Sequence, residues 1–308
     1  MSRIYEAVKK AEGEKASNGP VRAANAPLAS PAEAAHNDGA AQGARGIVSA
    51  LRTEGAPTTS GSGYLRLEEL RLRCARPGWR LDPNTMVFSG KQSFIRCAEQ
   101  FRTLRSRLYQ LQQEQPIRTV LVTSALPGEG KSFVALNLAQ AIVRQHERRA
   151  LLIDADLRAS KLHICMGAPS APGLADYLCG EADEFSIIQN DAQDNFFLIP
   201  VGKSVSNPAE LLANARLKSL LDRLAPLFDW IIVDTPPVLP VSDASVLAGM
   251  CDGVILVVSA GSTALDLAQA ACQEFQDKNL LGVVLNRAEG EATYGAYSYY
   301  GGNGRDKS

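Results

Sequence analysis

The sequence predicts an α/β fold in which helices cover both faces of a parallel sheet, and three observations support this prediction. Short apolar runs recur from residue 118 onward and alternate with segments of helical periodicity. These runs are apolar on both faces, which is typical of strands buried in a parallel sheet. A glycine-rich loop joins the first run to the first helical segment. Ligands of such sheets bind beyond the carboxyl ends of the strands, so a functional site is expected there.

The predicted elements alternate along the second half of the chain. In chain order they are TVLVTSA, SFVALNLAQAIVRQ, RALLIDAD, NFFLIPVG, NPAELLANARLKSLLDRLAPLF, DWIIVDTPP, DGVILVVSAG, ALDLAQAACQEFQDKN and LLGVVLNRA. The runs rich in Val, Ile, Leu and Phe indicate strands. The longer segments, in which apolar residues recur every three or four positions, indicate helices.

The overall composition is that of an ordinary globular chain. It has 308 residues, a formal net charge of −1, 45% hydrophobic residues and 21% charged residues. These values exclude a collagen, a coiled-coil rod and a wholly disordered protein, and the length suits one large domain or two small ones. Because the net charge is close to zero, we expect no nucleic-acid partner.

The sequence contains no signal for secretion or for crossing a membrane. Its first residues, MSRIYEAVKKAEGEK, contain no apolar core of the kind a signal peptide needs. No apolar run approaches the roughly 18 residues that cross a bilayer. Six cysteines lack a CxxC pair and three histidines are scattered, so we expect reduced thiols and no zinc site. A cytoplasmic protein is therefore predicted.

Shifts in composition divide the chain into four parts. In chain order they are a short helix (1–12), a disordered linker rich in Ala, Gly and Pro (13–62), a main domain that begins with a basic adaptor segment (63–288) and a flexible tail (289–308). The linker has almost no large apolar side chains to bury. Ile4, Val8 and Ala11 line one face of the predicted N-terminal helix, although a frayed terminus explains that segment equally well.

The loop after the first strand has the pattern of a phosphate-binding P-loop. It reads ALPGEGKS from Ala125 to Ser132 and lies between a strand and a helix, the context such a loop requires. Its backbone amides are expected to surround phosphates, while Lys131 reaches the β- and γ-phosphate oxygens and Ser132 ligates Mg²⁺. The strict pattern begins with Gly, and Ala125 is tolerable there if its φ is negative. The predicted nucleotide-binding residues are Gly128, Glu129, Gly130, Lys131, Ser132 and Phe133.

Acidic residues stand where two other apolar strands end. Asp154 and Asp156 close RALLIDAD, and Asp234 closes WIIVD. Carboxylates at those ends face the phosphate loop, so Ser132, Asp154 and Asp234 are the predicted metal ligands. The pair Asp154 and Asp156 also suits the acceptance of a proton from an attacking hydroxyl. A helix N-cap is the alternative role for any one of these residues.

Together, PGEGKS, LLIDADLR and IIVDTPP resemble the motifs of the bacterial tyrosine kinases of the capsular and exopolysaccharide type, the BY-kinases, over roughly residues 85–308. The segment around Asp154 resembles the second phosphate-site motif of that family, Walker A′, which the ParA/MinD partitioning ATPases also carry. Those ATPases have a second signature lysine immediately after the first residue of the loop, where this chain has Leu126. Partitioning ATPases are therefore the alternative family.

The resemblance implies a P-loop NTPase-like sheet and an ATP-dependent protein-tyrosine autokinase that regulates exopolysaccharide synthesis and export. ATP and Mg²⁺ are the implied cofactors, and the implied catalytic residues are Lys131, Asp154, Asp156 and Arg158. In this interpretation Asp154 activates a tyrosine hydroxyl, and Arg158 neutralises transition-state charge unless it is a surface arginine. The non-enzymatic alternative is a nucleotide-binding scaffold that another kinase modifies.

The segment EQFRTLR resembles the ExxRxxR motif through which BY-kinases assemble into rings. On a helix, Glu99, Arg102 and Arg105 lie on the side opposite to Phe101 and Leu104, which leaves a charged face free for a neighbouring subunit. A solvated helix face is the alternative, because exposed ion pairs contribute only ~0.2–1 kcal/mol each.

Four of the eight tyrosines lie in the last fifteen residues, in a glycine-rich context that buries nothing obvious. The resemblance implies that they are the phosphoacceptors: Tyr294, Tyr297, Tyr299 and Tyr300. A tail that packs or self-associates through its aromatic rings is the alternative.

The resemblance also implies partners and a place in the cell. The implied partners are further copies of the chain in a ring-like homo-oligomer, a separate transmembrane polysaccharide chain-length regulator as activator, and a protein-tyrosine phosphatase. Through the regulator, the protein is expected at the inner face of the plasma membrane.

Overall fold

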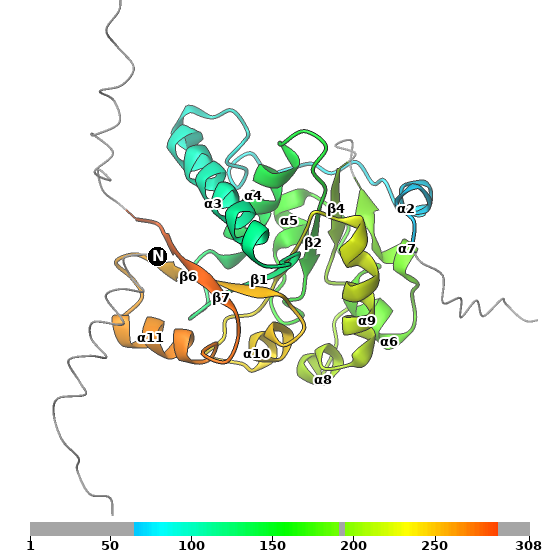
Figure 1. The fold of residues 1–308 in the computed structure, drawn as a ribbon. Helices are drawn as coiled ribbons and strands as arrows, with labels where there is room; N and C mark the ends of the chain where they lie inside the picture. The colour runs from blue at the N-terminus through cyan, green and yellow to red at the C-terminus, as the bar shows by residue number, and fades with distance from the viewer. Residues whose placement is uncertain (1–64, 191–194, 289–308) are drawn as a thin grey trace, which may run out of the picture. The chain divides into compact units, whose positions relative to one another are not determined.

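The computed structural model describes residues 65–190 and 195–288 (Figure 1). The predicted N-terminal helix (1–12), the linker (13–62) and the tyrosine-rich tail (289–308) lie outside these ranges. Within them, no helix is long and apolar enough to cross a membrane. All six cysteines are free thiols.

A seven-stranded sheet forms the centre of the fold (Figure 1). Its strands are β1 (Thr119–Ser124), β2 (Ala150–Asp154), β3 (Gln189–Asn190), β4 (Phe196–Ile199), β5 (Trp230–Asp234), β6 (Gly253–Ser259) and β7 (Leu280–Asn286). They are arranged in the order β3-β4-β2-β5-β1-β6-β7. Every neighbouring pair is parallel except β3 and β4. The predicted α/β fold with a parallel sheet is confirmed, and the short antiparallel edge strand is an addition to it.

Helices cover both faces of this sheet because its strands are apolar on both sides. The helices are α2 (Leu67–Arg73), α3 (Ile95–Glu114), α4 (Lys131–Val143), α5 (Leu162–Met166), α6 (Leu174–Cys179), α7 (Glu184–Ile187), α8 (Pro208–Leu212), α9 (Ala215–Leu224), α10 (Asp243–Ala248) and α11 (Leu265–Gln273). On β1, Val120 and Val122 pack with α3, α4 and α5, whereas Leu121 between them packs with α2 and α6 to α11. Successive residues of one strand therefore bury into two separate cores.

From residue 79 onward, the basic adaptor segment packs onto the α4 side of the sheet, whereas its first part, with α2, packs on the other side. Phe101 of α3 meets Phe133 of α4 edge to face, with ring centroids 6.0 Å apart. The buried Asn137 of α4 holds the preceding loop, because its Oδ1 accepts a hydrogen bond from Val87 N (2.8 Å) and its Nδ2 donates to Thr85 O (2.9 Å). These contacts fix the 81–89 loop and α3 against the helix that follows the P-loop.

Candidate active site

The glycine-rich loop connects the end of β1 to the start of α4, as a P-loop requires. Gly128 and Gly130 have φ values of 84° and 97°, a conformation that L side chains rarely adopt. At Gly130 a Cβ atom would also lie 2.1 Å from Asn286 Nδ2. Among the described residues, the non-glycine positions with positive φ are Glu147 and Arg287, so the alanine that opens the loop has a tolerable backbone conformation.

Glu129 braces this loop with its side chain. Its buried carboxylate accepts hydrogen bonds from Leu126 N (2.7 Å, at Oε2) and from the Thr263 hydroxyl (at Oε1). Its carbonyl oxygen accepts one from Asn286 Nδ2 (2.8 Å). The Glu129 carboxylate is thus hydrogen-bonded within the protein. The ring of Phe133 also has a contact within the protein, because it packs against Phe101 of α3. Of these two predicted nucleotide-binding residues, only the backbone amides are available to a phosphate.

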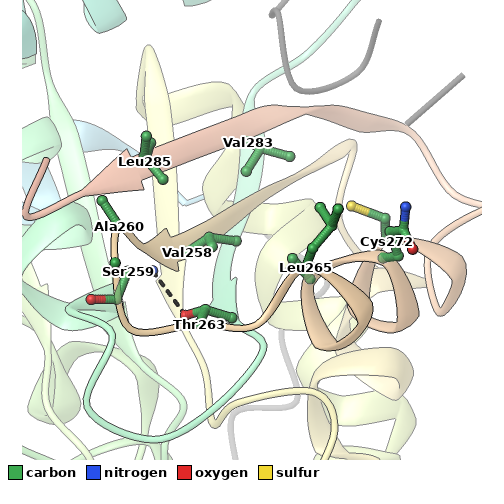
Figure 2. A pocket seen from close by; sticks show the side chains of 11 residues that line it. Val258, Ser259, Ala260, Thr263, Leu265, Cys272, Val283 and Leu285 are labelled. Atoms are coloured by element: carbon green, nitrogen blue, oxygen red, sulfur yellow. Dashed lines mark hydrogen bonds between the residues drawn. The ribbon is translucent and has the colours of Figure 1, made fainter. Parts of the chain in front are cut away.

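Thr263 lies on the turn after β6, beside an apolar cavity of about 180 Å³ between β6, β7 and α11 (Figure 2). Its hydroxyl accepts a hydrogen bond from Ser259 N (3.2 Å) and donates to Glu129. Leu265, Val283 and Leu285 form apolar walls of the cavity. Thr263 therefore links the phosphate loop to the end of β6.

Lys131 points into the cluster of acidic strand ends. Its Nζ donates a hydrogen bond to Asp156 Oδ2 (2.7 Å) and lies 4.0 Å from Asp234 Oδ1. Burial lowers the pKa of Lys131, but the Asp234 and Asp156 carboxylates outweigh it and the pKa is raised overall. The ammonium group therefore stays charged at the position where the sequence predicted a phosphate contact.

Asp154 and Asp234 lie side by side, because they are paired residues at the ends of the adjacent parallel strands β2 and β5. Asp154 is fully buried, and its Oδ2 accepts a hydrogen bond from Ser160 Oγ (2.5 Å). Burial and then the Asp234 charge raise the pKa of Asp154 to about 7. Burial likewise raises the pKa of Asp234 to about 6, although the Lys131 charge opposes it. Two carboxylates of this kind favour the uptake of a proton or a cation.

The predicted magnesium ligands fit that ion. Both carboxylate oxygens of Asp234 are buried and have no hydrogen-bond partner among the described residues, and their counter-charge there is Lys131 Nζ, 4.0 Å from Oδ1. Within residues 65–190 and 195–288, no group of three or more His, Cys, Asp or Glu side chains is arranged to hold a metal. Mg²⁺ at phosphate sites uses one or two carboxylates and completes its shell with waters and phosphate oxygens. Asp234, Ser132 and Asp154 are suited to this open arrangement.

Asp156 and Arg158 have partners that the prediction did not include. Asp156 Oδ1 accepts a hydrogen bond from Ala159 N (2.9 Å), so this carboxylate caps the following turn besides holding Lys131. The guanidinium of Arg158 makes a bidentate contact with the buried Asp243, with Nε to Oδ2 at 2.8 Å and Nη2 to Oδ1 at 3.0 Å. Arg158 thus has a counter-ion at the start of α10, and its role in neutralising transition-state charge stays a prediction.

Of the three residues predicted to form the assembly face of α3, Arg105 has a partner within its own chain. Glu99 and Arg102 pair with each other on the exposed side of α3. Arg105 Nη1 instead donates a hydrogen bond to Ala141 O (2.7 Å) at the end of α4. Arg105 is thus used within the chain, because its long side chain reaches a carbonyl that the helix end leaves free. The four predicted phosphoacceptor tyrosines lie outside the described residues.

Four residues of the site were not predicted from the sequence: Ser160, Asp243, Thr263 and Asn286. Asn286 ends β7 as Asp154 ends β2, so the same search for polar strand ends would have found it. Ser160 bonds both to Asp154 and to His163 Nδ1 (3.0 Å), but a serine in a polar loop carries no distinguishing signal. Asp243 and Thr263 act on residues far away in the sequence, which local patterns do not reveal.

Comparisons with known proteins agree with this geometry. A protein-family model described as an AAA domain matches residues 117–278. The chain is 33% identical over 226 residues to tyrosine-protein kinase YwqD of Bacillus subtilis (strain 168), covering 73% of this chain and 94% of that protein. It is 35% identical over 213 residues to tyrosine-protein kinase CpsD of Streptococcus agalactiae, covering 68% and 92%. The kinase domain of Escherichia coli tyrosine kinase ETK superposes with a TM-score of 0.58 at 33% identity, covering 64% of this chain and 80% of that one.

Proposed function

The chain belongs to the bacterial tyrosine-protein kinases, and from that membership we propose that it transfers the γ-phosphoryl group of ATP to the tyrosines of its own C-terminal tail. The observation that carries this proposal is the buried Asp154 at the end of β2. It lies next to Asp234 at the end of β5, and Lys131 points toward these strand ends from the start of α4. A carboxylate with a pKa of about 7 is suited to accept the proton of a tyrosine hydroxyl near neutral pH.

The P-loop residues hold the nucleotide in this proposal. The backbone amides from Gly128 to Ser132 and the positive end of α4 bind phosphate oxygens. Lys131 then exchanges its contact with Asp156 for the transferred phosphate. Asp234 and Ser132 would hold Mg²⁺, which neutralises negative charge on the phosphates when bound, while Asp154, also a predicted ligand, keeps its Oδ1 for the proton.

The proton of the attacking tyrosine goes to Asp154 Oδ1. The other oxygen, Oδ2, already accepts the hydrogen bond from Ser160 Oγ, whereas Oδ1 has only a long contact of 3.3 Å with Asp156 N. Burial excludes water from this carboxylate, so proton transfer requires a substrate hydroxyl to enter the site. Ser160 fixes the orientation of the carboxylate during that transfer.

The tail starts close to this site. Asn286, the last residue of β7, contacts the P-loop through Glu129 O. At about 3.5 Å per residue, the chain lets Tyr294 reach at most about 28 Å from Asn286, and it gives Tyr297, Tyr299 and Tyr300 a longer reach. We place the transfer between subunits, with the exposed Glu99 and Arg102 meeting a neighbouring copy in a ring-like homo-oligomer.

Mixing two altered chains tests the transfer between subunits. The acceptor is the full-length Lys131→Met chain, which keeps its tyrosines, and the donor is an active chain truncated after Gly290. With Mg²⁺ and ATP, phosphotyrosine is expected on the acceptor. A second acceptor that also carries Glu99→Ala and Arg102→Ala is expected to be labelled several-fold less, because it meets the donor less often. Immunoblotting measures the label, and light scattering measures co-assembly.

Two results of this experiment contradict the proposal. If the acceptor stays unlabelled although the chains co-assemble, transfer occurs within one subunit. If phosphate is released and no chain contains phosphotyrosine, the protein is an ATPase of another kind, such as a partitioning ATPase. Arg105 is left unchanged in these variants, because its bond to Ala141 supports α4.

Phosphorylation of the tail also supplies a way to end the cycle. Each phosphotyrosine carries about −1.5 to −2 charges, so four of them add roughly −6 to −8 near a site that already holds three carboxylates. The product tail is then repelled, the ring loosens, and a protein-tyrosine phosphatase removes the phosphates so that the ring can assemble again.

We place this cycle in exopolysaccharide or capsule synthesis, at the inner face of the plasma membrane. A separate transmembrane chain-length regulator is the proposed activator, and no nucleic-acid partner is expected.

The magnesium site is expected to make the stability of the protein depend on pH. Asp154 and Asp234 have pKa values of about 7 and about 6 in the folded protein, above the usual value of 3.8. The folded state therefore binds protons more tightly than the unfolded state, and the free energy of unfolding falls as pH rises from about 4 to 7. Mg²⁺ competes with those protons, so it should raise the melting temperature by about 3–8 °C at pH 8 and by much less at pH 5.5.

The Asp234→Asn variant separates this effect from general salt stabilisation. It should melt higher than the parent at pH 8 without Mg²⁺, because one buried charge is gone, and it should lose most of the response to Mg²⁺. Asp222→Asn, on the exposed side of α9, serves as the control and should behave like the parent. Equal Mg²⁺ shifts at both pH values, or in both variants, would show that these carboxylates do not hold the ion.

A further inference from the structure

A second cavity, of about 190 Å³, lies between the 81–89 loop and the C-terminal half of α4. Its lining residues are Leu81, Pro83, Met86, Phe88, Ser89, Gln140 and Arg144. Gln140 comes nine residues after Lys131 on α4, which corresponds to about 14 Å along the helix axis. The cavity is therefore separate from the phosphate site, although one helix joins the two.

The side chain of Gln140 contributes an unsatisfied donor to this cavity. The residue is 1% exposed, and its Nε2 has no hydrogen-bond partner in the part of the chain that the structure describes. One turn earlier, both Oδ1 and Nδ2 of Asn137 are bonded to the 81–89 loop. A buried amide donor without an acceptor is costly, and such groups normally meet a partner. The arrangement indicates that a hydrogen-bond acceptor of a ligand belongs in the cavity beside Gln140 Nε2.

Two arginine side chains place positive charge beside Phe88, in the wall of this cavity. The guanidinium of Arg144 lies 5.0 Å from the centre of the Phe88 ring, and that of Arg102 lies 5.7 Å from it. Partial burial and then repulsion by Arg102 lower the pKa of Arg144. Arg102 pairs with Glu99, but in the described ranges no carboxylate lies within ion-pair distance of Arg144. Arg144 Nη2 already donates a hydrogen bond to Phe88 O (3.0 Å), so an anionic acceptor would bond to Gln140 Nε2 and supply Arg144 with a counter-charge.

We propose that this cavity binds a carboxylate carried on a short apolar stem. The carboxylate oxygens accept from Gln140 Nε2 and face Arg144, while Leu81, Met86 and Phe88 surround the stem. A phosphate fits less well, because the lining offers one amide and one guanidinium, while its one hydroxyl, that of Ser89, already donates to Pro83 O (3.3 Å). An engineered cavity of about 150 Å³ holds benzene, so this volume admits a molecule of that size. The carboxylate comes either from a free short-chain acid or from an acidic side chain of a second copy of this chain.

Titration of the full chain with butyrate tests the proposal, with the uncharged butyramide as the matched probe. Methionine carries a methyl group that NMR detects after ¹³C labelling, and Met86 lines the cavity while Met250 packs in the core on the other face of the sheet. Butyrate should shift the Met86 signal in a saturable way, and butyramide should not. The Met250 signal should stay in place with both probes.

Two variants and a control identify the binding groups. Gln140→Leu removes the donor at similar volume, and Arg144→Gln removes the charge at an exposed position, so at least one variant is expected to fold normally. Each should weaken butyrate binding at least tenfold. Arg216→Gln is the control, because Arg216 also lies over an aromatic ring, 5.0 Å from the centre of Tyr177, but on α9.

The outcomes distinguish the two sources of the carboxylate. Butyrate binding that both variants lose, and the control keeps, supports a free acid. If butyrate does not bind, and light scattering shows a smaller assembly in both variants but not in the control, the carboxylate belongs to a second copy. If Met86 responds equally to butyrate and butyramide, or if neither binding nor assembly changes in the variants, the proposal is wrong.

Discussion

Lys131→Met is expected to lower tail phosphorylation by about 10²–10³-fold, because it removes a fixed positive charge from the developing phosphate charge. The structure adds a second expectation. Lys131 is also the counter-ion of Asp156 and Asp234, and its charge lowers the pKa of Asp234, so its loss should raise the pKa of Asp234 further. The fold should be retained, because methionine fills a similar volume and Asp234 can take up a proton.

The measurement is phosphotyrosine formed per minute with Mg²⁺ and ATP, together with the melting temperature of the variant. Lys203→Met is the matched control, since this lysine pairs with Glu181 on the surface. It should leave the rate unchanged. Undiminished phosphotyrosine in Lys131→Met would remove the P-loop lysine from the mechanism.

Asp154→Asn is expected to lower kcat by about 10²–10⁴-fold while the affinity for ATP changes little. Asparagine keeps an oxygen for the hydrogen bond from Ser160 but is unable to take a proton. In the parent, kcat/KM should fall as pH drops, because protonated Asp154 is not a base, and with Mg²⁺ bound the fall should occur below the pKa of about 7 that Asp154 has in the metal-free site. The residual activity of the variant should not show that fall.

Nucleotide affinity and pH–rate profiles measured side by side decide the role of this residue. Asp222→Asn again serves as the surface control. A variant that loses nucleotide binding but turns over normally at saturating ATP would show that Asp154 holds the nucleotide and does not act as the base.

Much of the fold could be predicted because its strands are apolar on both faces, a pattern visible without any partner. Short elements were missed, since β3 has two residues and α5 has five, too few for a periodic signal. The segment NPAELLANARLKSLLDRLAPLF was predicted as helical throughout, but it is split between α8 and α9. The split occurs at Asn214, whose side chain accepts a hydrogen bond from Arg216 N and starts a new helix.

In the candidate site, residues marked by a local sequence pattern could be predicted, whereas contacts between residues far apart in the sequence could not. Asp154 and Asp234 could be found because each ends an apolar strand. The ion pair that holds Arg158 joins residues 85 positions apart, and the bond between Glu129 and Thr263 spans 134 positions. Which distant residue meets a given side chain depends on how the strands are ordered, and that order is not contained in local periodicity.

The contact between Asn286 and Glu129 couples the end of β7 to the phosphate loop. Asn286 is the last residue of β7, and Arg287 after it turns the chain sharply with a φ of 55°. A displacement of the end of β7 would therefore move a side chain that is bonded to Glu129 O and lies 2.1 Å from the position that a Cβ atom on Gly130 would take. The conformation of the phosphate loop and the position of this strand end are thus tied to each other by one amide.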